Sequence, residues 1–221
     1  MNTALAGARA IAPLAIAVFP FGLVYGVTVA ESSFSDWAGI AASVLFIGGA
    51  AQLALINLTD DGAPWTIVVL TALVINLRMI MYSGALAPSF AGFERRWRVA
   101  LAWTITDQTT VTWLLYSDKE HDPKLRRRFY AGAAALFAST WVVGTTLGVL
   151  VGASIPPELQ LGFAVPLMFI ALLVPSVKDR PSLVAASVAF AVTLLAQGAP
   201  LNTGLLIGAA AGIAFGMLAR R

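Results

Sequence analysis

The chain has 221 residues, of which 59% are hydrophobic and only 11% charged, and its formal net charge is +3. Soluble domains carry about 25% charged residues, so this composition excludes an ordinary soluble domain and indicates a polytopic protein embedded in a lipid bilayer. The chain has no cysteine, which excludes disulfides and thiol chemistry. Its basic residues lie mostly in short connections, where they set membrane topology, so we expect no nucleic-acid partner.

Apolar segments of membrane-spanning length recur along the whole chain. A helix rises about 1.5 Å per residue, so about 20 residues cross the hydrocarbon layer. We therefore predict an all-α polytopic membrane protein with about eight transmembrane segments, or alternatively seven, in one transport domain that spans residues 1–221. The predicted segments are 10–30, 38–58, 65–87, 99–116, 129–153, 159–177, 183–198 and 203–219.

The first segment contains Pro20 and Gly22, closely followed by Tyr25. Proline removes a backbone donor and glycine loosens the turn, so this helix is either merely bent or truly discontinuous. A discontinuous helix would expose backbone groups that bind a zwitterion. Pro166 and Pro175 in the sixth segment could form a counterpart break, which leaves an inverted repeat open although no sequence repeat is evident.

The second and third segments carry polar residues at membrane depth. Gln52 follows the small residues of 48–51, where the lack of side-chain bulk would admit a ligand or another helix. Arg78 lies inside the apolar segment 65–87, although a fixed charge near a helix centre costs roughly 2.5–3.5 kcal/mol on insertion scales. Tyr82 shares a helix face with Arg78, whereas Asn76 lies on another face.

The guanidinium group of Arg78 presents a planar fork of donors that suits a carboxylate. It therefore either pairs with an intramembrane acid or receives a substrate carboxylate. Asp107 is the one acid well inside a predicted segment, and acids at membrane depth load and release protons in pumps and transporters. Asp107 is thus a candidate for proton coupling, with a structural ion pair or hydrogen bonds to neighbouring threonines as the alternative.

The distribution of basic residues predicts that the N-terminus is cytoplasmic and that Glu31 and Asp36 face outward. The basic connection 95–98 disagrees, because it would lie on the opposite side from the basic connection 119–128. The two share a side only if segment 99–116 does not cross the membrane as a simple helix. That segment is rich in threonine, so a broken helix that lines a cavity would explain both observations.

Glycines recur every four residues near the middle and the end of the chain. Small residues at this spacing form a flat stripe on which a second helix packs closely. We expect packing between helices of this chain, with docking of another membrane subunit as the alternative. The stripes are Gly144, Gly148 and Gly152, then Gly204, Gly208, Gly212 and Gly216, with Gly22 and Gly26 as a further pair.

An ordered set of motifs runs through the first half of the chain: Pro20-Phe21-Gly22 with Tyr25-Gly26, Gly49-Ala50-Ala51-Gln52, Asn76-Leu77-Arg78, Tyr82-Ser83, Pro88 and Thr106-Asp107. In this order they resemble the AzlC family, the large subunits of bacterial branched-chain amino-acid exporters. The resemblance implies export of leucine, isoleucine and valine, with methionine as a further candidate, across the bacterial inner membrane. It also implies a small AzlD-type membrane subunit as partner. Gln108 stands where family members often carry an acid.

The chain lacks a phosphate-binding loop of the G-x-x-x-x-G-K-[ST] type, so we predict a secondary transporter driven by the proton-motive force. We expect no cofactor and no metal, since the one histidine, His121, lies in a charged connection. We expect no enzyme either, because intramembrane proteolysis needs a Ser–His dyad, an aspartate pair or a zinc site. A non-transporting membrane scaffold or accessory subunit is the alternative. The predicted substrate-binding residues are Arg78, Asn76, Gln52, Pro20, Gly22, Tyr25 and Tyr82.

Overall fold

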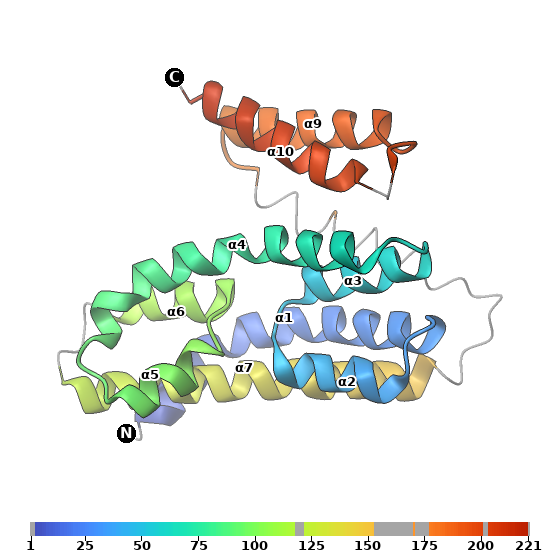
Figure 1. Ribbon diagram of the computed structural model, residues 1–221. Helices are drawn as coiled ribbons and strands as arrows, with labels where there is room; N and C mark the ends of the chain where they lie inside the picture. The colour runs from blue at the N-terminus through green and yellow to red at the C-terminus, as the bar shows by residue number, and fades with distance from the viewer. Residues whose placement is uncertain (1–2, 118–121, 153–169, 171–176, 201–202, 221) are drawn as a thin grey trace. The chain divides into compact units, whose positions relative to one another are not determined.

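The computed structural model describes residues 3–117, 122–152, 170, 177–200 and 203–220. Within these ranges it contains helices and no strand (Figure 1). The helices are α1 (Thr3–Glu31), α2 (Asp36–Leu45), α3 (Gly49–Asp60), α4 (Trp65–Phe90), α5 (Arg95–Ala102), α6 (Asp107–Ser117), α7 (Pro123–Gly152), α9 (Arg180–Leu195) and α10 (Gly204–Leu218). Three of them, α1, α4 and α7, are long and apolar enough to cross a membrane.

The all-α polytopic membrane class is therefore confirmed. The predicted sixth segment, 159–177, lies almost wholly outside the described residues, as do Pro166 and Pro175, so the number of spans stays a prediction. The chain forms two compact units. The first unit consists of Met1–Leu53 and Ile75–Pro156, and the second of Ala54–Val74 and Pro157–Arg221.

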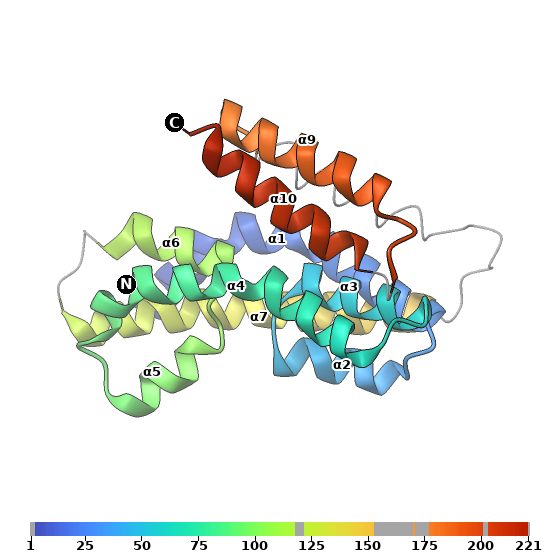
Figure 2. The same cartoon turned by 45° about the horizontal axis from the view of Figure 1, so that its top comes forward.

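In the first unit, α1 and α7 lie side by side and run in the same direction (Figures 1 and 2). Gly7 near the start of α1 contacts the backbone of Phe129, whereas Gly26 near its end contacts Gly148. A Cβ atom added at Gly22 would lie 3.2 Å from the carbonyl oxygen of Trp141. The glycines thus allow backbone to pack on backbone, which confirms packing within the chain for this stripe.

Helix α1 is continuous from Thr3 to Glu31 although Pro13 and Pro20 lie inside it. The structure therefore contains the unbroken form of the first segment and not the discontinuous one. Membrane helices tolerate proline where neighbouring groups satisfy the freed carbonyl. Pro20 is exposed, while Gly22 is buried against α7.

The predicted second segment, 38–58, is not one helix but two, α2 and α3, with a break at residues 46–48. We call this pair of helices the first hairpin. Glycine has a low helix propensity, and Gly48 and Gly49 stand at this break. The Gln52 side chain supports it, since its Oε1 accepts a hydrogen bond from the Gly48 N–H at 3.4 Å. Gly39 in α2 contacts Val29, so this hairpin starts at the end of the unit where α1 finishes.

Segment 99–116 is also broken, as predicted. It forms α5 and α6, with a break at residues 103–106, and we call this pair of helices the second hairpin. Both of its ends lie beside the start of α7. Near the start of α5, the Trp97 ring lies 4.6 Å from the Arg127 guanidinium. At the end of α6, Tyr116 stacks on Phe129 with 3.5 Å between ring centroids. Figure 2 shows α5 and α6 leaving and returning to the same end.

This geometry removes the disagreement over basic residues. Glu94, beside the first basic connection, pairs with Arg127 of the second at 3.4 Å, so the two connections share one end of the unit. The order of elements along the chain is also repeated. Helix α1 runs away from this end and is followed by the first hairpin, whereas residues 75–90 of α4 run toward this end and are followed by the second hairpin. That order agrees with an inverted repeat.

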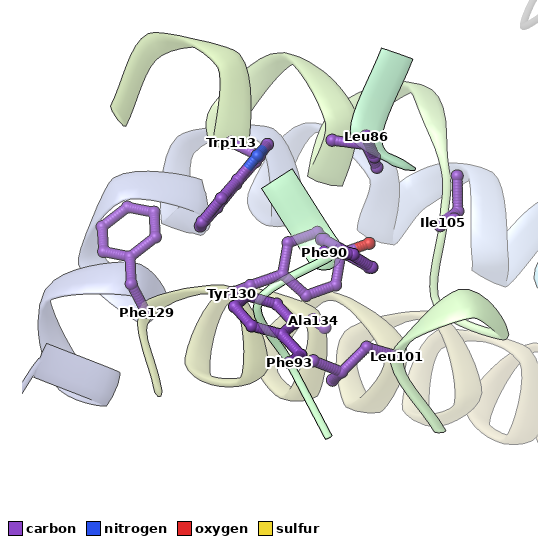
Figure 3. Packing of buried hydrophobic residues seen from close by; sticks show 9 residues of the cluster. All are labelled: Leu86, Phe90, Phe93, Leu101, Ile105, Trp113, Phe129, Tyr130 and Ala134. Carbon is purple, nitrogen blue, oxygen red and sulfur yellow. The ribbon is translucent and has the colours of Figure 1, made fainter. Parts of the chain in front are cut away.

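We call the end of the first unit where the two basic connections lie the basic end. An aromatic cluster holds the second hairpin there (Figure 3). Trp113 of α6 is 1% exposed and Tyr130 of α7 is also 1% exposed. Phe90 at the end of α4 lies 5.0 Å from Tyr130, ring centroid to ring centroid. Burying such rings removes a large apolar surface from solvent, so α4, α6 and α7 are held together here. The cluster comprises Leu86, Phe90, Phe93, Leu101, Ile105, Trp113, Phe129, Tyr130 and Ala134.

In the second unit, α9 and α10 pack along the second glycine stripe. A Cβ atom at Gly212 would lie 2.7 Å from the carbonyl oxygen of Ala185, and one at Gly204 would lie 2.6 Å from that of Ala196. The predicted packing within the chain is confirmed here too. Helix α9 begins at a defined cap, because the Asp179 carboxylate accepts a hydrogen bond of 2.8 Å from the Ser182 N–H.

Candidate functional site

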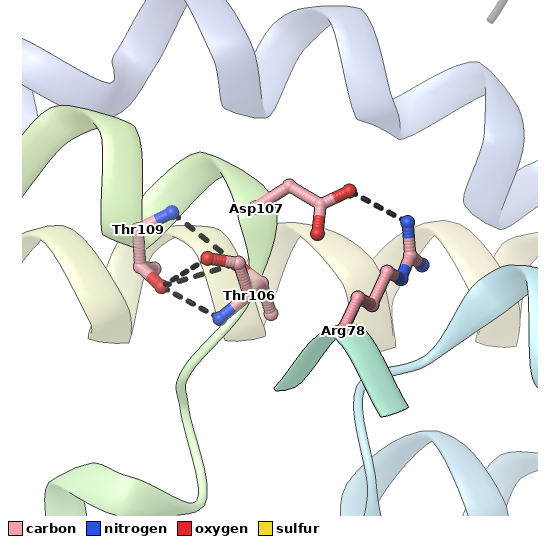
Figure 4. Close-up of polar contacts among 4 residues, drawn as sticks. All are labelled: Arg78, Thr106, Asp107 and Thr109. Atoms are coloured by element: carbon pink, nitrogen blue, oxygen red, sulfur yellow. Dashed lines mark hydrogen bonds and ion pairs between the residues drawn. The ribbon is translucent and has the colours of Figure 1, made fainter. Parts of the chain in front are cut away.

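The two charges found at membrane depth form an ion pair within the first unit. Nη1 of Arg78, from α4, lies 2.8 Å from Oδ2 of Asp107, the first residue of α6 (Figure 4). The two side chains are 35% and 36% exposed, so the pair is not sealed in a protein core. The amino end of a helix carries a partial positive charge, which adds to the stabilisation of Asp107 as an anion.

Two threonines fix the point at which α6 begins. The Thr106 N–H donates to Thr109 Oγ1 at 2.9 Å, and the Thr109 N–H donates to Thr106 Oγ1 at 3.2 Å (Figure 4). This reciprocal pattern is that of a capping box. Thr109 Oγ1 also donates to the carbonyl oxygen of Thr104 at 2.9 Å. Backbone groups released by the break thus have partners, and Asp107 is held at the first position of the helix.

The breaks of the two hairpins meet. Nε1 of Trp103, in the second break, donates a 2.7 Å hydrogen bond to the carbonyl oxygen of Leu45, the last residue of α2. Helix α4 reaches both breaks: Arg78 contacts Asp107, and Oδ1 of Asn76 lies 3.3 Å from where a Cβ atom at Gly48 would stand. The centre of the site is therefore the junction of two broken helices with the middle of α4.

Three buried polar atoms at this junction have no hydrogen-bond partner among the described residues. They are Nε of Arg78, Oδ1 of Asp107 and Oδ1 of Asn76. More than about 90% of buried polar groups in proteins have partners, so a group of unpaired ones indicates a place for a ligand or water. One of these atoms is a donor and two are acceptors. A zwitterion, with an anionic and a cationic end, has the complementary groups.

Tyr82 completes the group around the ion pair. It lies one helical turn after Arg78, is partly buried, and stands close enough to Asp107 to interact with its carboxylate. The structure therefore brings Arg78, Tyr82 and Asp107 together from the predicted set, whereas Asn76 faces the break of the first hairpin at Gly48. Trp103 was not identified in the sequence analysis. A tryptophan indole N–H next to a threonine-rich stretch was the one feature that could have pointed to it.

Gln52 and Tyr25 belong to a different, fully buried polar network. Each is 1% exposed. Nε2 of Gln52 donates to Ser43 Oγ at 3.2 Å, Ser43 Oγ lies 3.0 Å from Thr145 Oγ1, and the Tyr25 hydroxyl donates to the Gly39 carbonyl at 3.2 Å. These bonds hold the first hairpin against α1 and α7.

The structure thus gives Gln52 and Tyr25 partners within the protein, and it gives Gly22 a packing role in the contact between α1 and α7. Pro20 lies on an exposed side of α1. Their predicted roles in substrate binding stay predictions. Ser43 and Thr145 were overlooked because single hydroxyl residues in apolar helices give little signal, although Thr145 directly follows a glycine of the stripe.

Comparison with known proteins identifies the family of this chain and two of its relatives. The family model of the AzlC protein matches residues 13–155, a range that contains both hairpins and the ion pair. An uncharacterized membrane protein of Archaeoglobus fulgidus is 30% identical over 76% of this chain and 73% of its own length. The inner membrane protein YgaZ of Escherichia coli K12 is 24% identical over 82% of this chain and 76% of its own. No solved structure matches. The chain belongs to the AzlC family.

Proposed function

We propose that the protein is a secondary transporter, and not an enzyme, that exports branched-chain amino acids across the bacterial inner membrane together with a small AzlD-type subunit. Membership of the AzlC family supports a role in membrane transport. The observation that carries the proposal is the ion pair between Arg78 and Asp107 at the junction of two broken helices. Transporters commonly bind substrate where helices are interrupted near the middle of the membrane.

A free amino acid carries a carboxylate and an ammonium group, and the ion pair offers one partner for each. The substrate carboxylate binds the guanidinium of Arg78, whose Nε has no partner among the described residues. The ammonium group binds the carboxylate of Asp107 through its unpaired Oδ1. The substrate thus replaces the contact of 2.8 Å that joins the two side chains.

This arrangement couples transport to protons by competition at Asp107. A protonated carboxyl group no longer attracts an ammonium ion, whereas the guanidinium of Arg78 stays charged. Protonation from outside therefore expels the substrate, and release of the proton to the cytoplasm recruits the next one. With a cytoplasmic N-terminus, the basic end that holds α5 and the start of α7 faces the cytoplasm, so inward proton flow drives outward substrate flow.

The experiment is efflux of labelled leucine from proteoliposomes that contain the protein with or without its small subunit. We expect efflux that requires both proteins and accelerates when protons can flow opposite to leucine. Arg78→Met should lose at least about tenfold in rate, since it removes charged hydrogen bonds. Asp107→Asn should lose the response to the proton gradient. Normal efflux by Arg78→Met, or no efflux under any condition, would overturn the proposal and favour a scaffold.

A further inference from the structure

Buried polar side-chain atoms without a hydrogen-bond partner are not spread evenly over the two hairpins. Among the described residues, the first hairpin has none, whereas the second hairpin has several. More than about 90% of buried polar groups in proteins have partners, and ordered water supplies those that the protein does not. The second hairpin is therefore where buried water is expected. Its unpaired atoms belong to Trp97, Asp107, Thr110, Thr112 and Trp113.

Three of these residues follow one another along α6 at intervals of three: Asp107, Thr110 and Trp113. We propose that Thr110 and Trp113 hold a short chain of water molecules along α6 through which Asp107 gives up its proton toward the basic end. This inference rests on the proposed function and deepens it, because it assigns the route by which the coupling proton leaves the site.

The spacing of the three residues suits bridging water molecules. Each step of three residues advances about 4.5 Å along the helix and turns about 60° around its axis, which leaves about 5–6 Å between Cβ atoms. A water molecule with two hydrogen bonds of about 2.8 Å spans the same length. Long side chains on helices point back toward the helix start. Figure 3 shows the indole nitrogen of Trp113 on the side of the ring away from Phe129, which stacks on Tyr116 at the end of α6.

Trp113 brings the chain to the basic end. The guanidinium carbon of Arg126 lies 5.2 Å from the centroid of the Trp113 ring, and Nη2 of Arg126 donates a hydrogen bond of 3.1 Å to Ser89 Oγ. Arg126 belongs to the start of α7, where the two basic connections lie. Because Thr110 is 2% exposed and Trp113 is 1% exposed, protein shields the water between them from lipid.

Within the described part of the chain, Asp107 is the one group of this series that exchanges a proton near neutral pH. The charged or titratable neighbours are Arg78 and Tyr82 beside Asp107, and Arg126 and Tyr130 beside the indole. Tyrosine and arginine give up protons only at about pH 10 and above. The chain therefore carries the proton of Asp107 and not that of another side chain.

The proton moves after the substrate has left, when Oδ1 of Asp107 is free to contact water. The carboxyl group gives its proton to the first water, and each following oxygen takes one proton and passes one on. Asp107 becomes a carboxylate and one proton reaches the basic end. The Thr110 hydroxyl both donates and accepts hydrogen bonds, whereas the indole of Trp113 only donates. Trp113 thus orients a water molecule without carrying a proton itself.

Thr110→Val removes the hydroxyl and keeps the shape of the side chain. Two assays on the protein reconstituted with its small subunit separate its effects: leucine efflux driven by an opposing proton gradient, and exchange of internal for external leucine, which needs no net proton movement. We expect Thr110→Val to slow driven efflux about three- to tenfold, as for one lost hydrogen bond, and to leave exchange unchanged. Thr110→Ser, which restores the hydroxyl, should behave as the wild type.

Thr112→Val is the matched control, since Thr112 is also buried on α6 with an unpaired hydroxyl. It lies five residues after Asp107 and about 140° away around the helix axis, so it is not in the series. Thr112→Val should keep wild-type efflux. Equal slowing by the two variants would overturn the water chain, and so would parallel slowing of driven efflux and exchange by Thr110→Val, because both results indicate a structural effect.

Heavy water gives a readout that altered packing does not change. If Thr110→Val makes proton release limiting, its driven efflux should slow more in heavy water than that of the wild type; an equal isotope effect would contradict the water chain. If wild-type efflux does not respond to the proton gradient, the proposed coupling fails, and the water chain with it. If the wild type and Thr110→Val respond equally, only the water chain is lost.

Discussion

The contact between α1 and α7 and the junction of the two hairpins both depend on glycine, but they use it for opposite purposes. Along α1 and α7, the space of each missing side chain is filled by backbone of the other helix: a Cβ atom at Gly144 would lie 3.1 Å from the Phe19 carbonyl oxygen. At the junction, Gly48 faces the side chains of Asn76 and Phe46, and buried polar atoms there lack partners within the described residues.

This difference distinguishes two parts of the first unit: the frame, which consists of the packed helices α1 and α7, and the junction of the two hairpin breaks. Helices packed backbone to backbone leave no room to shift, whereas the two breaks are joined to each other by the hydrogen bond from Trp103 to Leu45, which opens at lower cost. Regions that bind ligands or move are drawn from the less stable parts of a protein. We therefore interpret α1 and α7 as a fixed frame against which the two hairpin breaks open and close over the ion pair. Three of the predictions that follow test this comparison, and a fourth concerns the second unit.

The largest effect is expected in the frame. A Cβ atom at Gly26 would overlap the Thr145 carbonyl oxygen and lie 2.8 Å from the Cα atom of Gly148. Because neither neighbour is a flexible side chain, Gly26→Ala should lower the free energy of unfolding by about 2–3 kcal/mol. Thermal unfolding in detergent measures this, with Gly84→Ala as the control, because a Cβ atom at Gly84 would have no neighbour within 4 Å. An effect no larger than that of Gly84→Ala would show that the helices are not packed this closely.

A smaller effect is expected at the ion pair. Asp107→Leu leaves Arg78 without its anion, which costs about 3–5 kcal/mol for a buried pair but about 0–1 kcal/mol for an exposed one. With about a third of each side chain exposed, we expect an intermediate loss, about 1–2 kcal/mol. The double variant Arg78→Met with Asp107→Leu should recover most of it in unfolding measurements. A double variant less stable than either single one would contradict this interpretation.

The hydrogen bond between the hairpins should have a modest effect. Trp103→Phe keeps an aromatic ring but removes the N–H that donates to Leu45 at 2.7 Å, so stability should fall by about 1 kcal/mol. The break should also open more often. Since the chain has no native cysteine, Phe46→Cys reports this opening by its rate of maleimide labelling. An equal labelling rate with and without the Trp103 donor would show that this bond does not hold the breaks together.

The smallest effect is expected in the second unit. Hydrogen bonds from Ser182 hold the pKa of Asp179 below its ordinary value. The capping of α9 is therefore fully present above the unfolded pKa of about 3.9 and is lost as pH falls through the lower folded pKa. The protection of the Ser182 N–H, which is its observed hydrogen-exchange rate compared with the intrinsic rate at the same pH, should fall below about pH 4. Asp179→Asn, which can still cap, should keep its protection there; the same loss of protection in that variant would exclude Asp179 as its source.

Parts of this structure could be predicted from the sequence because charge leaves few options in a membrane. Arg78 needs an anion, and Asp107 was the obvious intramembrane partner. The break in segment 99–116 followed from its polarity and from the two basic connections on either side. The glycine spacing predicted close packing, although it could not reveal that α1 pairs with α7.

The remaining features depend on tertiary partners that a sequence does not display. Pro20 and Gly48 both occur in apolar segments, yet the helix continues through Pro20 and stops before Gly48. The difference depends on neighbours, since Gln52 satisfies the Gly48 N–H and is itself held by Ser43. Broken backbone is tolerated at membrane depth only where such groups replace the helical bonds, and these contacts join residues from several helices.

The central claim is that the Arg78–Asp107 pair at the junction of the two breaks holds the substrate. Equilibrium binding of labelled leucine to the purified complex with its small subunit, measured at one fixed pH, tests it most directly, because binding requires neither an ion gradient nor a transport cycle. We predict that Arg78→Met weakens binding at least about tenfold, whereas Gly84→Ala binds as the wild type does. Wild-type leucine affinity in Arg78→Met would contradict the claim.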